Sequence, residues 1–230
     1  MKQIFFDFNL RKSFPDPELA SSLYDYCLGF GGDMSVERLL AAYKKGIFPW
    51  YIYKSQPYWF SPDPRCVLLP DELHISSSMK QIIKSGKMTA TFDRDFKSVI
   101  KNCATAKRKH DASTWISKTF IDAYCKLQEA GYAHSVEVWM ENNLIGGLYG
   151  VSLGKCFFGE SMFSKESNAS KFAFIFLVNQ LKEKQFQLID CQVYNPHLAT
   201  LGAKTIPRKE FIDRLKIALK GKTWKGKWEN

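Results

Sequence analysis

The sequence lacks a long hydrophobic run. Its longest uninterrupted apolar stretch is Phe172 to Val178, whereas a helix needs about 20 apolar residues to span a bilayer. The short apolar patch at the N-terminus is interrupted by Asp7, and no small-residue cleavage site follows it. We therefore expect a cytoplasmic protein with no signal peptide and no membrane partner.

The sequence also lacks the motifs that hold metals and nucleotides. Its six cysteines are scattered and form no C-x-x-C pair, so they do not fit a structural zinc site, and in a cytoplasmic protein they stay reduced. There is no G-x-G-x-x-G and no G-x-x-x-x-G-K-S/T phosphate loop. We expect no metal and no cofactor.

Positive charge is present in excess. The formal net charge of +10 over 230 residues suggests a polyanion partner such as nucleic acid, although a basic surface without a partner would give the same charge. Lys107, Arg108 and Lys109 stand together, and the C-terminal segment "KGKTWKGKWEN" alternates lysines with Trp224 and Trp228. Cations interleaved with aromatic rings suit phosphates and bases. For that last segment, however, we expect a disordered tail.

Prolines divide the chain into two parts. Residues 13–48 are predicted to be helical, with Ser35 as an N-cap and Gly46 as a C-terminal stop. Five prolines between positions 49 and 70 exclude long regular elements there, so we expect an ordered connector. This places a small N-terminal domain and its connector in residues 1–67 and a second domain in residues 68–230.

The second domain is predicted to mix helices with a sheet. Helical patterns cover residues 76–86, 95–104, 117–131, 168–185 and 209–219, and strand patterns cover 88–93, 133–163 and 186–193. The segment 133–163 should form three strands, with turns at Asn142–Asn143 and at Gly154. A meander, then a helix, then a further strand predict a mixed α/β layer fold.

Carboxylates and an amide interrupt two apolar strands. Alternation places Asp190 and Gln192 on one face of "QLIDCQV", and it places Glu160 on one face with Phe158 and Met162. Burying an unpaired carboxylate is costly. Either a structural pair with an arginine or a catalytic task explains these residues, and the pattern leaves both open.

Two further patterns have simpler explanations. His134 and Ser135 are adjacent on a strand and therefore point to opposite faces, which excludes a simple Ser–His–acid triad. The aromatic residues between Trp50 and Phe60 are dense. They fit either an apolar core or a platform on which a base stacks.

Seven colinear segments between about residues 33 and 212 carry a family resemblance: "AAYKKGIFPWY", "WFSPDPRCVL", "STWI", "AYCKLQEAGYAHSVEVW", "IGGLYGVSLGKCFFGESMFS", "NASKFA" and "LIDCQVYNPHLATLGAKTIPR". Together they resemble the leucyl/phenylalanyl-tRNA–protein transferases. The resemblance implies transfer of Leu or Phe, less readily Met, from aminoacyl-tRNA to the N-terminal Arg or Lys of an acceptor protein, which is then degraded. It also implies a C-terminal domain related to the GNAT acetyltransferases, and we expect a monomer.

The resemblance assigns roles to residues. It implies catalytic roles for Asp190 and Gln192 of the D-C-Q motif and for Glu160. It implies a donor amino-acid pocket of Leu148, Phe157, Met162, Ser164, Ala173, Leu177 and Ile189. It implies adenosine stacking on Trp59, Phe60 and Trp115, and tRNA backbone contacts from Lys107, Arg108 and Lys109. An α-amine has a pKa of about 7.7–8 and needs little help to lose a proton. Asp190 is therefore either a base or a positioning group, and Gln192 can polarise the ester carbonyl or position the amine.

Some positions depart from the family pattern. Phe60 and Ser113 stand where the family usually has Trp and Gly, Gln128 replaces a His, and Leu177 replaces a Phe. These changes leave the order of preference among Leu, Phe and Met open. One rival, an acetyl-CoA-dependent acetyltransferase, requires a Q/R-x-x-G-x-G/A loop between a strand and a helix, and "ESMFSKESNAS" occupies the expected place instead. A second rival, an RNA-binding module, gives the embedded carboxylates no role.

Overall fold

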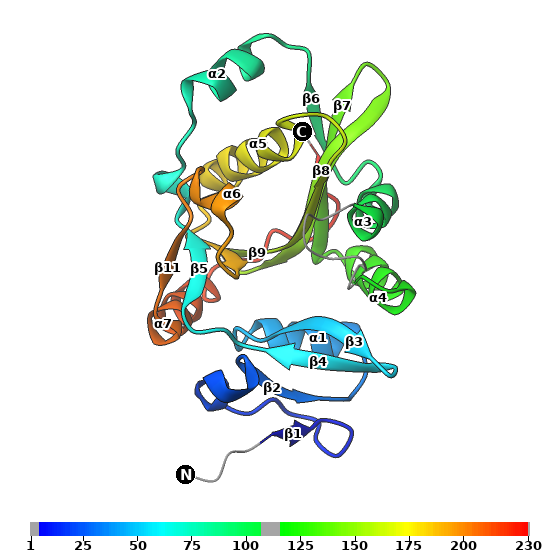
Figure 1. Ribbon diagram of the computed structural model, residues 1–230, viewed down its shortest axis with the longest axis vertical. Coiled ribbons are helices and arrows are strands. Elements are labelled where there is room, and N and C mark those ends of the chain that lie inside the picture. The colour runs from blue at the N-terminus through cyan, green and yellow to red at the C-terminus, as the bar shows by residue number, and fades with distance from the viewer. Residues whose placement is uncertain (1–4, 107–115, 230) are drawn as a thin grey trace.

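Two β-sheets organise the molecule (Figure 1). The computed structural model describes residues 5–106 and 116–229. The smaller sheet has the strand order β1-β2-β4-β3, and the seven-stranded sheet has the order β11-β5-β10-β9-β8-β7-β6. Helices and strands are mixed along the chain, which confirms the predicted mixed α/β class.

The N-terminal unit contains the smaller sheet and one helix. Its elements are β1 (Phe6–Asp7), β2 (Cys27–Phe30), α1 (Val36–Tyr43), β3 (Phe48–Tyr53) and β4 (Gln56–Phe60). Helix α1 begins as predicted, because Ser35 Oγ accepts a hydrogen bond from the backbone N–H of Arg38. The helix predicted between residues 13 and 34 was wrong: two single 3-10 turns and β2 occupy that segment.

The expected connector was also wrong, because residues 48–60 form a hairpin. Pro49 lies on β3, an edge strand. A proline is tolerated there because an edge strand needs no second set of partners. Lys54 and Ser55 form the turn, with φ values of 47° and 62°, the left-handed conformation of favoured hairpin turns. The aromatic residues therefore lie in a sheet.

The larger sheet begins with β5 (Arg65–Leu68), just before the expected domain boundary. The strand β6 (Thr89–Phe92) and the three-stranded meander of β7 (Ala133–Met140), β8 (Asn143–Leu153) and β9 (Cys156–Ser164) follow the prediction, except that the first turn lies at Glu141–Asn142, one residue earlier than expected. The remaining strands are β10 (Leu188–Gln192) and β11 (Lys204–Ile206). The helices are α2 (Ser77–Lys84), α3 (Phe96–Thr105), α4 (Lys118–Glu129), α5 (Ala169–Glu183), α6 (Pro196–Ala199) and α7 (Arg208–Ala218).

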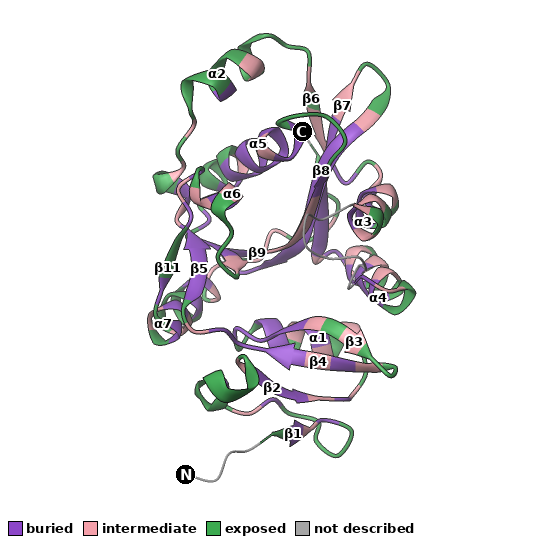
Figure 2. Ribbon diagram, in the orientation of Figure 1, coloured by how far each residue is buried: buried purple, intermediate pink, exposed green. Residues whose placement is uncertain are grey.

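Helices cover both faces of this sheet. Helix α5 lies on one face, and α3 and α4 lie on the other (Figure 1). Strand β8 is buried along almost its whole length between these layers (Figure 2). Each strand pair is antiparallel except β9–β10, which is parallel and is joined by the α5 crossover. None of the described helices has the length and apolarity that a bilayer crossing requires.

The expectation of a disordered C-terminal tail was wrong. The Trp228 ring is 0% exposed and is stacked between His134, at a centroid distance of 3.8 Å, and Trp224, at 4.0 Å. The Trp228 N–H donates to Asp93, whose carboxylate also bonds His134. The two tryptophans therefore anchor the tail in the core.

Candidate active site

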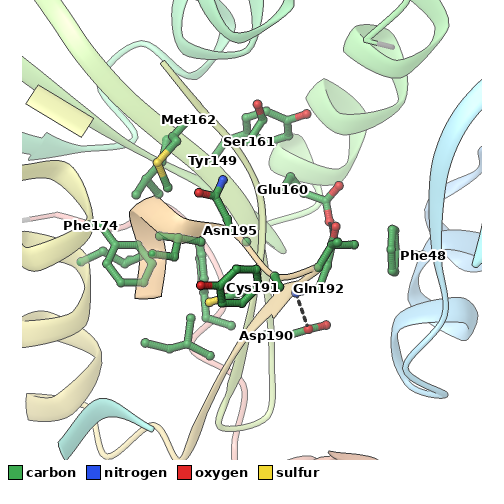
Figure 3. A pocket seen from close by; sticks show the side chains of 18 of the residues that line it. Phe48, Tyr149, Glu160, Ser161, Met162, Phe174, Asp190, Cys191, Gln192 and Asn195 are labelled. Atoms are coloured by element: carbon green, nitrogen blue, oxygen red, sulfur yellow. Dashed lines mark hydrogen bonds between the residues drawn. The ribbon is translucent and has the colours of Figure 1, made fainter. Parts of the chain in front are cut away.

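A pocket of about 380 Å³ opens where β9 and β10 separate. The two strands pair only through residues 156–158 and 188–190. Beyond that point, residues 159–162 line one side of the pocket and residues 191–195 line the other. Helix α5 contributes Phe174, and the N-terminal hairpin contributes Phe48 on the opposite side (Figure 3).

Most of the predicted donor-pocket residues line this pocket: Leu148, Phe157, Met162, Leu177 and Ile189. Ala173 is instead buried in the core around α5. Ser164 is exposed, and its Oγ accepts a hydrogen bond from the Ser170 N–H at the start of α5. Sequence analysis missed Phe174, which lies one helical turn before Leu177, a spacing that could have indicated it.

Glu160 lies on a β-bulge. Gly150 pairs with Gly159 and Tyr149 pairs with Ser161, so Glu160 is the extra residue of β9. The expectation that Phe158, Glu160 and Met162 share one face was therefore wrong. Phe158 packs in the core that includes α3 and α4, whereas Met162 packs on the α5 side. The extra residue of a bulge shifts the later side chains of the strand to the opposite face. Simple alternation assumes that no such residue is present, so it could not predict this arrangement.

Three donors converge on the Glu160 carboxylate. Tyr43 OH donates to Oε1 at 2.7 Å, and Gln192 Nε2 donates to the same oxygen at 2.8 Å. Tyr124 OH donates to Oε2 at 2.9 Å. The two tyrosine hydroxyls also contact each other. Tyr43 and Tyr124 come from α1 and α4, so this cluster joins the N-terminal unit to the larger sheet.

Burial raises the pKa of Glu160 to about 7, against the opposing effect of these three hydrogen bonds. Burial disfavours the charged carboxylate, whereas donated hydrogen bonds favour it. A carboxylate with this pKa exchanges its proton near neutral pH. This property suits an acid or base at a reacting centre.

Asp190 forms the buried arginine pair that the sequence left open. Arg65 Nε and Nη2 donate to its two oxygens at 2.8 and 2.7 Å, and both side chains are 0% exposed. The Gln192 backbone N–H adds a third hydrogen bond of 2.9 Å (Figure 3). The Arg65 guanidinium lies over the rings of Phe48 and Phe211.

The simple alternation predicted for Asp190 and Gln192 does not hold. The register of β10 against β5 shifts between the two residues, and Gln192 has a φ of 62°. The Asp190 side chain turns to Arg65, whereas the Gln192 side chain reaches Glu160. Asp190, which also lines the pocket, therefore supports the backbone of Gln192.

The predicted stacking residues have different environments. Trp59 and Phe60 are 0% and 4% exposed, and Trp59 Nε1 donates to the Gly31 carbonyl. A buried ring presents no face to a ligand, so this geometry does not support stacking at these two positions. Trp50 is half-buried and lines the pocket. Trp115 and the basic residues Lys107, Arg108 and Lys109 lie outside the described residues.

Comparison with known proteins matches both parts of the chain to one family. Residues 67–216 match the family model described as leucyl/phenylalanyl-tRNA protein transferase, and residues 32–63 match the model of its N-terminal domain. The leucyl/phenylalanyl-tRNA--protein transferase of Syntrophus aciditrophicus (strain SB) is 53% identical over 92% of this chain and 89% of its own. Its counterpart in Desulfatibacillum aliphaticivorans is 49% identical over 94% and 91%. This chain therefore belongs to the leucyl/phenylalanyl-tRNA protein transferase family.

Proposed function

We propose that this protein transfers leucine or phenylalanine, and less readily methionine, from aminoacyl-tRNA to the N-terminal Arg or Lys of an acceptor protein. The product then carries an N-terminal residue that directs the protein to degradation. The observation that carries this proposal is the apolar pocket whose polar end is formed by Glu160 and Gln192.

The apolar walls suit the donor side chain. Leu148, Met162 and Leu177 come from β8, β9 and α5 and surround one pocket. Such walls admit Leu and Phe, and they reject polar donors by the cost of desolvation and β-branched donors by shape. We assign the aromatic contact with the terminal adenosine to Trp50, which lines this pocket, together with the predicted Trp115.

The polar end of the pocket suits the acceptor amine. The amine nitrogen attacks the ester carbonyl, the new C–N bond forms, and the tRNA ribose oxygen leaves with a proton. Glu160 attracts the cationic acceptor and takes a proton from its ammonium group near neutral pH. The Gln192 amide orients the reacting groups, and Asp190 holds the Gln192 backbone in place.

The remainder of the tRNA is bound through charge. The net charge of +10 supplies the attraction, and the predicted contacts of Lys107, Arg108 and Lys109 are with backbone phosphates. Phosphate contacts position the nucleic acid without reading its sequence. This fits a protein that must accept both leucyl- and phenylalanyl-tRNA.

A transfer assay tests the proposal. The protein is mixed with phenylalanyl-tRNA and a peptide that begins with Arg, and mass spectrometry should detect one added Phe. A peptide that begins with Ala or Asp, and acetyl-CoA as a separate donor, should give no product. Bound tRNA without transfer would instead support an RNA-binding module, and an acetylated peptide would support an acetyltransferase.

A further inference from the structure

Cys66 and Cys191 lie side by side on β5 and β10. Cys66 is paired with Gln192 and Val67 is paired with Asp190, so Cys191 is the extra residue between two consecutive pairs. Both are free thiols, and both pack in the apolar cluster on the α5 side of the sheet. At such a bulge two residues oppose one residue of the partner strand, so Cys191 and Gln192 both lie opposite Cys66, and the two thiols are close enough to form a hydrogen bond with each other.

The two thiols are also hydrogen-bonded to each other, and this bond affects the pKa of both. A hydrogen bond from Cys191 lowers the pKa of the Cys66 thiol, and the Asn195 backbone N–H contributes in the same direction. The same hydrogen bond, together with burial, raises the pKa of Cys191 well above its usual value. The two thiols therefore titrate as one coupled pair, and the proton that remains after the first ionisation is shared between the two sulfurs. A thiolate beside a thiol is the arrangement from which disulfides form.

The pocket gives a small reagent access to this pair. Cys66 is 0% exposed, but Cys191 is half-buried and lines the pocket between Asp190 and Gln192 (Figure 3). Among the other cysteines, Cys27, Cys103 and Cys156 are buried. Cys191 is thus the sulfur that a molecule in the pocket meets, and Cys66 is the second thiol directly behind it.

We propose that Cys66 and Cys191 form a reversible disulfide when a peroxide enters the pocket, and that this cross-link stops the transfer reaction. The first part stands alone, whereas the second rests on the proposed function. With its proton passed to Cys66 across their hydrogen bond, the Cys191 thiolate attacks one oxygen of hydrogen peroxide, giving a sulfenic acid and a hydroxide that takes up a proton to become water. Cys66 then displaces the sulfenic hydroxyl, which leaves as a second water with the remaining thiol proton. Two thiols lose two electrons, and the peroxide is reduced to two waters.

The cross-link disturbs the reacting groups because Cys191 lies between two of them. Gln192 has a left-handed φ of 62° and reaches Glu160 from that conformation. A new bond that draws the Cys191 sulfur toward β5 moves the adjacent Gln192 away from Glu160. Reduction by dithiothreitol breaks the bond and restores the arrangement.

Mass spectrometry of the peroxide-treated protein tests the site. The folded protein is treated with hydrogen peroxide, the remaining thiols are alkylated, and tryptic peptides are analysed without reduction. We expect peptides 66–80 and 185–204 to be linked, with a loss of two hydrogens. The variants Cys66→Ser and Cys191→Ser should give no linked pair, whereas Cys125→Ser, a half-buried thiol on α4, should cross-link like the unaltered protein.

Transfer activity, measured before oxidation, after oxidation and after reduction, tests the effect of the cross-link separately from the proposed function. Transfer should fall in proportion to the cross-linked fraction and return after dithiothreitol. Absence of the linked peptides from oxidised wild-type protein would show that the Cys66–Cys191 disulfide does not form. Full transfer by the cross-linked protein would show that the disulfide does not stop the reaction. If the untreated protein transfers nothing, the proposed function fails, and the linked peptides still decide whether the site exists.

Discussion

Arg65 and Asp190 are separated by 125 positions in the chain and form a buried bidentate ion pair. The pair joins β5, at the start of the larger sheet, to β10 beside the pocket. Because each side chain is 0% exposed, water does not solvate either charge, and the two charges neutralise each other.

Replacement of Arg65 should destabilise the protein strongly. Arg65→Ala leaves the Asp190 carboxylate buried without its partner, which costs about 3–5 kcal/mol of unfolding free energy. Urea denaturation measures the change. As a control, Lys209→Ala removes an exposed pair with Asp213 and should cost less than about 1 kcal/mol. Equal effects of the two substitutions would contradict the role given to the Arg65–Asp190 pair.

Transfer should depend on the ionisation of Glu160. Its pKa of about 7 predicts that kcat/KM rises with pH through this value as the carboxylate loses its proton. Glu160→Gln should lower transfer by about a hundredfold or more and remove this limb. The remaining rise should follow the acceptor amine at about 7.7–8. Glu183→Gln, on an exposed part of α5, should leave the profile unchanged; an unchanged profile in Glu160→Gln would exclude Glu160 as the titrating group.

The same group should make stability pH-dependent. The folded-state pKa of Glu160, about 7, lies above its ordinary value of 4.5, so the folded state binds the proton more tightly than the unfolded chain. This contribution is fully present below the unfolded-state value and is lost as pH rises through about 7. Urea titrations between pH 4.5 and 8 should show a weaker decline for Glu160→Gln than for the wild type. An equal decline in both proteins would assign the effect to other groups.

The tail should contribute to stability through Trp228. Trp228→Ala removes a ring stacked between His134 and Trp224, and a core Trp→Ala change costs about 3–5 kcal/mol. Thermal unfolding measures this loss. The neighbouring Lys227 is exposed, so Lys227→Ala should leave the melting temperature nearly unchanged. A melting temperature unaffected by both substitutions would show that the tail does not hold the core together.

Two glycines near the pocket should tolerate alanine differently. A Cβ at Gly150 would lie 2.2 Å from the Phe158 carbonyl oxygen and 2.5 Å from the Phe157 ring. At Gly159, its pairing partner, the nearest atom is the Asp190 carbonyl oxygen at 3.5 Å. Gly150→Ala should therefore reduce stability and transfer, and Gly159→Ala should be close to neutral. Circular dichroism melts and the transfer assay distinguish them, and the reverse order would contradict the packing described here.

Local signals predicted many elements of this fold and fewer of its long-range contacts. Ser35 and Gly46 delimit α1 because caps act within one helical turn, and alternation predicted the meander of β7, β8 and β9. The hairpin containing Pro49 was missed, because only the strand order shows that Pro49 lies at a sheet edge. The tail was missed because the site that Trp228 fills is built from distant segments.

For the candidate site too, residue types were predicted and long-range contacts were missed. The family resemblance predicted the apolar wall residues Leu148 and Met162, and both line the pocket. An apolar wall depends mainly on residue type, which can be read from the sequence. The roles of Tyr43, Tyr124 and Arg65 were missed. Each acts through hydrogen bonds or an ion pair to residues far away in the sequence, and nothing near it in the sequence indicates its partners. The bulge at Glu160 has no local signal either.

The pocket can form only late in synthesis, because its walls come from segments that lie far apart in the sequence. Its walls come from residues near positions 48–50, 148–149, 157–162, 174–177 and 189–198, and β10 enters the sheet only after the α5 crossover has been made. Contacts between such distant segments form slowly, because long loops must close first. A nascent chain that stops before β10 has no complete pocket, however well its N-terminal unit is folded. A complete pocket for an aminoacyl group therefore forms only after the segment that contains β10 has been synthesised.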